Sequence, residues 1–596
     1  MYSHLVRFCL LVLVSFISNT VAFAQSGGNG LLRGDVNGDG EVGMSDVMYI
    51  VQYVLNGKFP DDGMTEFQKT AILSGYNSDV EDLSEEKSLS LDIPRCAIIN
   101  ITNDEGKASW PVTKVEDRKY YMEFWDMNGH YFKKEIIMNA QGNSSILFPK
   151  KNGTIDICNN NGWDDEDAFS LKFGNWVPQS SFHMKSYYLD YTRGAAVVGY
   201  QLADEVLKTR GVLRDRSWKL AVLNSGGTLS TSDLDAETDV RCMPDGFPVI
   251  VHMNGDFYGI YSWQLKKHRD NYHMDKKNTK HIHLDGEISA ASMWGDSIDW
   301  NKFEVRNPKS LKDVNGEKYD GDNPKELAEG DVKDAIVRLS KSVREIDAAF
   351  KESVEAGKAK LEEYYDVDNL IDYLMGNMAI GNTDAYAKNW QWTTWDGKKW
   401  YANQYDLDEC WGIHYSGTYI SNPSILSGNY PGTPVYYIWN YYRQETKARW
   451  AELVSAGIFT IENVLGKLND WMSRVGEMNY AKEWEKWQEA PCNRESGLDS
   501  KNWEFLGKYK ARLEENDARW DNCKQYNVGD EVYFATDKDI RWLKVKAVKP
   551  NVNMPPYTIR YNELPHYGGG KDNKRRFEEW IEEHLRKQTE YFENLK

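Results

Sequence analysis

Two patterns of apolar residues, one typical of strands and one typical of helices, occupy separate parts of this chain. Short apolar runs at 96–101, 120–124 and 135–138 are separated by Asn-Gly and Asp-Glu-Gly turns, which is typical of paired strands. Later, apolar residues recur every three or four positions in the manner of helices, as at Ile336, Leu339, Val343, Ile346 and Phe350. This order predicts an α+β fold with two lobes, a strand-rich N-terminal lobe and a helical C-terminal lobe, rather than alternating βα units.

Composition narrows the classes of function. The chain has 596 residues with 41% apolar content, which is enough for a large domain with appendages. Its formal net charge of -19 argues against nucleic-acid binding, because that function relies on a basic surface. No GxSxG, HExxH or Walker motif occurs, so the sequence does not indicate a serine hydrolase, a zinc protease or a P-loop enzyme.

The N-terminus has the pattern of an export signal. Arg7 precedes an apolar run from 8 to 17 and the small-residue pattern Ala22-Phe23-Ala24, as in a secretory signal peptide. We therefore predict a signal peptide at 1–24, a linker at 25–33 and a secreted or extracytoplasmic protein, in the periplasm or at the cell surface. No later stretch reaches the roughly 18 apolar residues of a membrane span. The mature cysteines lack the spacing of a zinc site, and the expected compartment permits disulfides.

A candidate calcium loop follows the linker. Residues 34–46 match the EF-hand loop template, with Gly40 at the sharp turn and oxygen ligands from Asp35, Asn37, Asp39, Glu41 and Asp46. We predict a small EF-hand-like, Ca²⁺-binding unit at 34–83. Its loop and helix resemble one repeat of a type I dockerin, without the second repeat that dockerins carry. The resemblance implies a cohesin-like receptor as a candidate partner.

Two acidic motifs in the second half have the layout of a phosphoryl-transfer site. Asp384 is followed by Asn389, and Asp406 comes after a strand-like turn. In such sites the first carboxylate orients a hydroxyl, whereas the amide and the later carboxylate hold a divalent metal. Upstream, the turn at 141–145 reads Gln-Gly-Asn-Ser-Ser, and its N–H groups and hydroxyls could face phosphate oxygens.

Together these motifs resemble the CotH family of atypical protein kinases. The same order includes Tyr-Leu-Asp-Tyr-Thr-Arg at 188–193 and Tyr-Asp-Leu-Asp-Glu-Cys-Trp-Gly at 405–412, and the resemblance covers roughly residues 95–596. It implies an atypical protein-kinase-like domain at 93–596. It also implies ATP with Mg²⁺ or Mn²⁺, and protein substrates that accept phosphate on Ser or Thr.

The resemblance assigns roles to individual residues. Asp384 matches the catalytic aspartate, Asn389 and Asp406 match metal ligands, and Asp408 is a further metal candidate. Expected nucleotide-binding residues are Gln141, Gly142, Ser144, Ser145, Lys150, Lys151 and Arg193. The family commonly has an acidic residue near the position where this chain has Gln264, so one expected contact is neutral here.

Two other functions remain open. One is a pseudokinase scaffold or surface-binding protein, and the other is a component of a carbohydrate-active enzyme system, suggested by the dockerin resemblance and the 22 tryptophans. Residues 524–570 predict an inserted small β unit with a faint similarity to chitin-type carbohydrate-binding modules, which makes a glycan a candidate partner. The same aromatic residues also fit a hairpin that packs against the rest of the fold.

Overall fold

The structure, a computed structural model, describes most of the chain from residue 80 to residue 595. The undescribed stretches are 1–79, 115–116, 127, 143–144, 149, 165–166, 211–242, 287–292, 296, 322–323, 383, 387–388, 414–426, 488–501, 511–516, 519, 521–524, 536–541, 551–570 and 596. The predicted signal peptide, the linker and the calcium loop with Asp35, Asn37, Asp39, Glu41 and Asp46 therefore lie outside the described residues.

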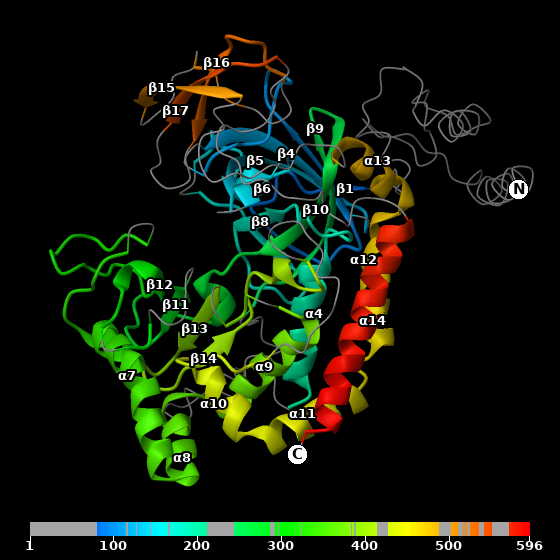
Figure 1. The fold of residues 1–596 in the computed structure, drawn as a ribbon. Coiled ribbons are helices and arrows are strands. Elements are labelled where there is room, and N and C mark those ends of the chain that lie inside the picture. The colour runs from blue at the N-terminus through cyan, green and yellow to red at the C-terminus, as the bar shows by residue number, and fades with distance from the viewer. Residues whose placement is uncertain are drawn as a thin grey trace, which may run out of the picture.

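An eight-stranded sheet forms one end of the molecule (Figure 1). Its order is β1-β5-β4-β3-β9-β10-β8-β6, and β6 also pairs with β5, so seven of the strands close into a ring. Asn254 and Gly255 have φ of 53° and 87°, which suits the tight hairpin between β9 and β10. The strands are β1 (Glu81–Asp82), β3 (Ala97–Thr102), β4 (Arg118–Trp125), β5 (His130–Gln141), β6 (Asn152–Cys158), β8 (Ser181–Lys185), β9 (Gly246–Met253) and β10 (Asp256–Leu265).

Three smaller sheets complete the strand content. A four-stranded antiparallel sheet has the order β12-β11-β13-β14, with β11 (Ile282–Gly286), β12 (Phe303–Asn307), β13 (Trp390–Thr394) and β14 (Tyr401–Asn403). A parallel pair consists of β2 (Ser88–Leu91) and β7 (Ser170–Phe173). A three-stranded sheet has the order β15-β17-β16, with β15 (Trp503–Lys510), β16 (Glu531–Ala535) and β17 (Trp542–Ala547).

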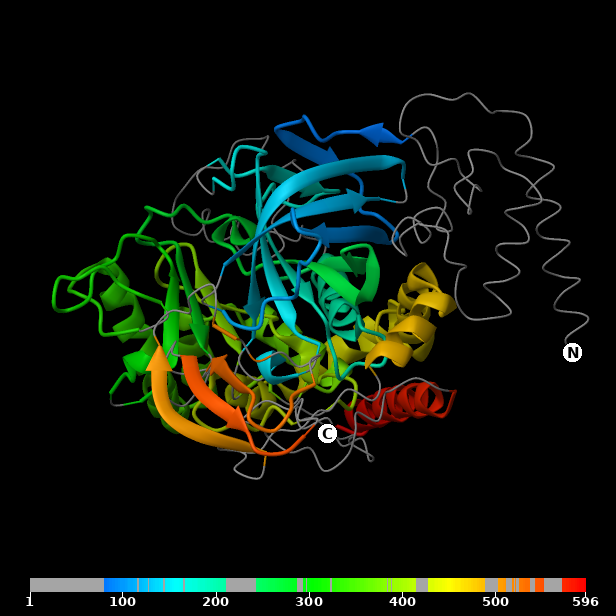
Figure 2. The same ribbon diagram turned by 90° about the horizontal axis from the view of Figure 1, so that it is seen from above.

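Two strands of the three-stranded sheet, β16 and β17, lie within the predicted β unit at 524–570, whereas β15 begins upstream of it, at Trp503. It lies at the same end of the molecule as the closed sheet (Figure 1) and beside that sheet when seen from above (Figure 2). Several of its aromatic side chains are buried in a small core of their own, including Trp503, Trp520, Tyr526 and Phe534. These rings therefore stabilise the unit and do not form an exposed platform for sugars.

Helices make up most of the opposite end of the molecule (Figure 1). Helix α9 illustrates the local signals, because the Asp366 carboxylate caps its first turn and Gly381, with φ of 66°, ends it. The α-helices are α4 (Ala195–Lys208), α7 (Asp331–Glu352), α8 (Val354–Tyr364), α9 (Val367–Ile380), α10 (Pro434–Tyr441), α11 (Arg443–Ser455), α12 (Ile461–Val475), α13 (Glu477–Trp487) and α14 (Lys571–Glu593). Short 3₁₀ helices are η1 (Ser145–Leu147), η2 (Arg269–Tyr272), η4 (Trp300–Lys302) and η5 (Leu407–Glu409).

The predicted mixture of strands and helices is confirmed, and it is organised around two main hydrophobic cores. One core fills the closed sheet, whereas the larger one joins the helices to the four-stranded sheet. Helix α4 belongs to the helical core although its sequence lies between β8 and β9. In the opposite direction, Val475 and Tyr480 at α12 and α13 pack against the outer side of the closed sheet.

Two further findings concern the sequence expectations. The described cysteines Cys96, Cys158 and Cys410 are buried, while the other mature cysteines lie in undescribed stretches. None of the described helices combines the length and apolar character needed to cross a membrane.

Candidate active site

A cavity of about 450 Å³ lies where the two main parts of the fold meet. Its walls come from the β5–β6 turn, from β6, from β8 and the residues after it, and from the residues that follow β10. Further walls come from β11, β12 and the loops that precede β13 and follow β14. Of the residues predicted from sequence, those that line this cavity are Gln141, Gly142, Ser145, Asn389, Asp406 and Asp408.

The first acidic motif begins directly after α9. Asn382 accepts a hydrogen bond from the backbone N–H of Asp384 at 3.2 Å. Asn389 then donates from Nδ2 to Oδ2 of Asp384 at 3.2 Å. Asn389 also has φ of 54°, a left-handed conformation that non-glycine residues adopt mainly at special sites. Asp384 is thus joined to the cavity wall through Asn389.

The second acidic motif follows β14. Asp406 has φ of 53° and precedes η5, so the backbone turns sharply at this residue. Asp406, Asp408 and Glu409 all line the cavity. Left-handed residues occur at both motifs, which is the kind of local strain that functional sites often contain.

Lys185 is the main site residue that sequence reasoning missed. Its ammonium lies 3.8 Å from Oδ1 of Asp406, at the end of β8. The side chain is only 6% exposed, and no acceptor among the described residues is within hydrogen-bonding distance. A nearly buried ammonium that lines a cavity is suited to binding an anionic ligand. Its position as the last residue of a strand run was a weak signal.

Three more cations surround His183 in the cavity. Burial lowers the pKa of His183 well below its usual range, and Lys185, Lys266, Lys267 and Arg306 lower it further. The imidazole is therefore neutral. Burial would raise the pKa of Asp285, but Lys267 and Arg306 outweigh burial and hold it low. This part of the cavity therefore combines charged side chains of both signs in a buried setting.

The β5–β6 turn has a conformation that requires glycine. Gly142 has φ of 113°, and a Cβ at this position would lie 2.0 Å from Oγ of Ser145. Gln141, Gly142 and Ser145 face the cavity, whereas Ser144 lies outside the described residues. The turn thus brings backbone groups and a hydroxyl to the cavity, as the sequence suggested.

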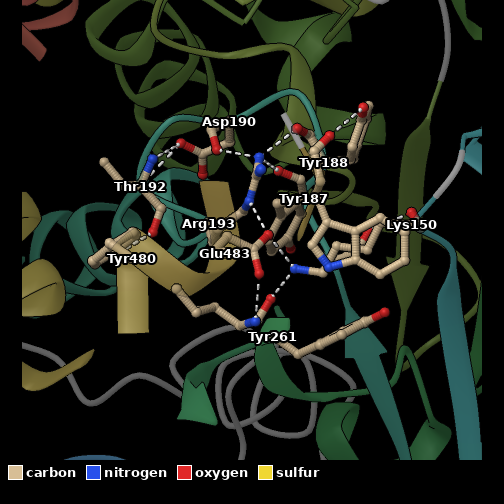
Figure 3. Close-up of polar contacts among 12 residues, drawn as sticks. Lys150, Tyr187, Tyr188, Asp190, Thr192, Arg193, Tyr261, Tyr480 and Glu483 are labelled. Atoms are coloured by element: carbon tan, nitrogen blue, oxygen red, sulfur yellow. Dashed lines mark hydrogen bonds and ion pairs between the residues drawn. The ribbon is translucent and has the colours of Figure 1, made fainter. Parts of the chain in front are cut away.

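Lys150 and Arg193 do not line the cavity. They meet at Glu483 of α13, which accepts hydrogen bonds from Nζ of Lys150 at 2.6 Å and from Nε of Arg193 at 2.9 Å (Figure 3). The backbone N–H of Ile260 donates to the same carboxylate at 2.8 Å. Burial lowers the pKa of Lys150 to about 7. Burial would raise the pKa of Glu483, but Lys150 and Arg193 hold it below the usual range.

This buried cluster supports the cavity wall from behind. Arg193 donates through Nη1 to the carbonyls of Tyr187 at 3.1 Å and Asp190 at 2.8 Å, and also to the carbonyl of Tyr188 (Figure 3). All three of those residues line the cavity. Arg193 therefore shapes the segment after β8 rather than facing a ligand itself.

Lys151 and Gln264 also act behind the wall. Lys151 donates to the carbonyls of Ile146 at 2.8 Å and Phe148 at 3.0 Å, so its ammonium holds the turn that follows β5. Gln264 is buried and accepts a hydrogen bond from the hydroxyl of Tyr187 at 2.6 Å. Its neutral amide suits this partner, and Gln264 is not among the cavity-lining residues.

One side of the cavity carries side-chain oxygens of the kind that bind Mg²⁺. Asn389, Asp406 and Asp408 supply one amide and two carboxylates from two neighbouring loops. Magnesium commonly takes few protein ligands and completes its shell with water and phosphate oxygens. The described residues contain no cluster of three or more His, Cys, Asp or Glu side chains placed to hold a metal, so a phosphate-bearing ligand would have to contribute.

Comparison with known proteins points to one family. A family model described as CotH kinase protein matches residues 242–519. This segment contains Asp384, Asn389, Asp406 and Glu483, and it is similar to CotH kinase proteins. The β5–β6 turn and Lys185 precede it, and α14 follows it. Among curated proteins, none matches the chain.

Proposed function

We propose that this protein is a secreted CotH-like protein kinase. It would transfer the γ-phosphoryl group of ATP to Ser or Thr hydroxyls of extracytoplasmic proteins. The observation that carries this proposal is that Asn389, Asp406 and Lys185 line one cavity, within and beside a segment similar to CotH kinases. Asp384 is linked to this cavity by the hydrogen bond that Asn389 donates to it. The closed sheet and the helical part would act as the two lobes of a kinase-like domain.

The proposed chemistry needs little from the protein beyond position and charge. The acceptor hydroxyl oxygen forms a bond to the γ-phosphorus, while the bond from that phosphorus to the β–γ bridging oxygen breaks. ADP leaves with the electron pair, and the hydroxyl proton passes to the Asp384 carboxylate. A divalent cation, when bound, would neutralise charge that develops on the phosphates.

Each wall of the cavity would have a separate task. Asn389, Asp406 and Asp408 would hold the cation, and Lys185 would neutralise phosphate oxygens near Asp406. Gln141, Gly142, Ser144 and Ser145 would contact the phosphates from the β5–β6 turn. Lys150, Lys151 and Arg193, which sequence alone suggested as phosphate contacts, would instead support the turn and the wall.

The predicted N-terminal unit belongs to the same proposal. Its loop would bind Ca²⁺, and a cohesin-like receptor would be its candidate partner. In that arrangement the N-terminal unit would fix the place of the protein outside the cell while the larger part acts on substrates.

The direct test is incorporation of label from γ-labelled ATP into the protein itself and into Ser- and Thr-containing peptides, with Mg²⁺ and with Mn²⁺. The wild type should incorporate label, whereas Asp384→Ala and Asp406→Ala should not. Equal labelling of all three proteins, including none in any of them, would refute the catalytic assignment.

A pseudokinase scaffold is the second candidate. The position of Lys150 and Arg193 favours it, because these two expected phosphate contacts pair with Glu483 and do not line the cavity. Thermal melting shows whether the protein binds ATP with metal, since a ligand that prefers the folded state raises the melting temperature. A rise with ATP and metal but no transfer would support the scaffold.

A further inference from the structure

Trp580 of the C-terminal helix packs against the backbone of both acidic motif segments. A Cβ added to Gly381 would lie 2.7 Å from Cη2 of Trp580, and one added to Gly412 would lie 2.7 Å from its Cε2. Both glycines have positive φ, 66° and 79°. The indole of Trp580 therefore fills the space beside both glycines, one in each motif segment.

These glycines mark the two segments on which the proposed reaction depends. Gly381 lies three residues before Asp384, and Gly412 lies six residues after Asp406. The backbone N–H of Trp411 donates to the carbonyl of Ile380 at 2.8 Å, so the segments are joined where the indole covers them.

His584 adds a polar contact one helical turn after Trp580. Its ring stacks on Trp580 with centroids 4.6 Å apart, and Nε2 lies 2.7 Å from the carbonyl oxygen of Met378, near the end of α9. Burial lowers the pKa of His584 to about 4, so the ring is neutral and donates one N–H to this carbonyl.

Helix α4 contacts the same segments independently. A Cβ at Gly199 would lie 2.9 Å from Cδ1 of Leu407. Nε1 of Trp411 donates to the carbonyl of Ala195 at 3.0 Å. The motif segments are thus packed against both α4 and α14, and α14 runs along the outside of the helical part (Figure 1).

We propose that Trp580, supported by His584, is a positioning residue for the proposed phosphoryl-transfer site. It fixes the distance between the segment that carries Asp384 and the segment that carries Asp406. Helix α14 begins at Lys571, beyond the end of the CotH match at residue 519. The matched segment therefore depends on a C-terminal helix outside it for a complete site. This inference rests on the proposed function only where it concerns reaction rate.

The test compares Trp580→Ala and Trp580→Phe with Phe592→Ala. Phe592 is a buried aromatic residue of the same helix, and it stacks on Trp450 of α11 with centroids 4.8 Å apart. Phe592→Ala therefore matches the loss of a buried ring without touching either motif segment. Trp580→Phe is the alternative if Trp580→Ala does not fold, because it keeps part of the aromatic contact and leaves a smaller cavity.

Two measurements decide the outcome. In the folded Trp580 variants, kcat for phosphoryl transfer should fall, by about 100-fold for an ångström of misplacement, with little change in KM for ATP. Hydrogen exchange should rise in peptides covering 378–384 and 404–412, but not in β9 and β10. Trp580→Phe should lie between wild type and Trp580→Ala.

The inference and the proposed function can fail separately. If Trp580 variants match Phe592→Ala in exchange at both segments, the positioning role is refuted, whatever the activity. If the wild type transfers no phosphate while exchange rises as expected, the proposed function fails and the structural role of Trp580 stands.

Discussion

Asn389 donates a hydrogen bond to Asp384 across 3.2 Å, and this contact joins the carboxylate of the first motif to a residue that lines the cavity. A hydroxyl that attacks phosphorus must lose its proton, and the carboxylate that takes this proton must be held in a fixed orientation. The hydrogen bond from the Asn389 amide constrains the orientation of the Asp384 carboxylate.

Asp384→Asn should separate binding from chemistry. The substitution keeps the size of the side chain and an oxygen for Asn389, but it removes the negative charge that accepts the proton. We expect the transfer rate to fall by about 10²–10⁴-fold, the usual contribution of a general base. The melting temperature should still rise with ATP and Mn²⁺. Loss of that rise together with activity would show that Asp384 acts in binding.

Lys185→Met should weaken nucleotide binding more than Lys151→Met. Lys185 lines the cavity, whereas Lys151 holds backbone carbonyls behind it. Loss of a charged hydrogen-bond partner should cost about 1.5–3 kcal/mol of ATP binding. Calorimetric titration of both variants with ATP and Mn²⁺ provides the comparison. A larger loss in Lys151→Met, at equal thermal stability, would restore the sequence-based assignment.

Glu483→Ala should destabilise the fold strongly. The substitution leaves Lys150 and Arg193 buried without their shared carboxylate. Breaking a buried charge cluster in this way typically costs about 3–5 kcal/mol. Glu445→Ala is the control, because Glu445 pairs with Lys358 at the surface and should cost about 0–1 kcal/mol. Denaturant unfolding measures both, and equal losses would show that the cluster contributes little.

Lys150 should make stability depend on pH above neutrality. Its pKa is about 7 in the folded protein, whereas an unfolded lysine titrates near about 10.4. Between these values the unfolded chain binds the extra proton, so this group makes stability rise with pH by up to about 1.4 kcal/mol per unit. Below about pH 7 both states are protonated and the contribution is flat. Lys150→Met should remove this slope in denaturant unfolding series, and parallel curves for the two proteins would contradict the assignment.

The candidate calcium loop can be tested independently of the proposed phosphoryl-transfer activity. Calorimetric titration of the full chain with Ca²⁺ should give binding that Asp35→Ala abolishes, because Asp35 is the first ligand of the loop. Phosphoryl transfer in Asp384→Asn should remain impaired with and without Ca²⁺. Unchanged calcium binding in Asp35→Ala would exclude the loop.

Local patterns predicted the elements that depend on local sequence. The period of Ile336, Leu339, Val343 and Ile346 corresponds to the buried face of α7, and Gly381 ends α9 as a C-terminal glycine should. The acidic motifs were recognisable because their spacing is short. Their spacing predicted one site for Asp384, Asn389 and Asp406, and of these Asn389 and Asp406 line the cavity.

Contacts between distant segments could not be read from the same patterns. The partner of Lys150 is 333 positions away, on a helix whose sequence carries no mark of that contact. Lys185 reaches Asp406 only because β8 and the loop after β14 meet in space. Trp580 of α14 packs against Gly381 and Gly412, which lie in distant parts of the sequence. In each case a non-local approach decides the role, and periodicity contains no information about it.

The path of the chain between the two cores limits how the protein can be divided. β3 pairs in parallel with β9, so Ala97 lies opposite Val249, and α4 leaves for the helical core between them. The chain is synthesised from its N-terminus, so the ring of strands cannot close before β10 has been made. Helix α4 cannot pack fully until the later helices of its core have also been made. A protease that cuts once between β3 and β10 should accordingly leave no fragment that contains the whole ring of strands or refolds into it alone.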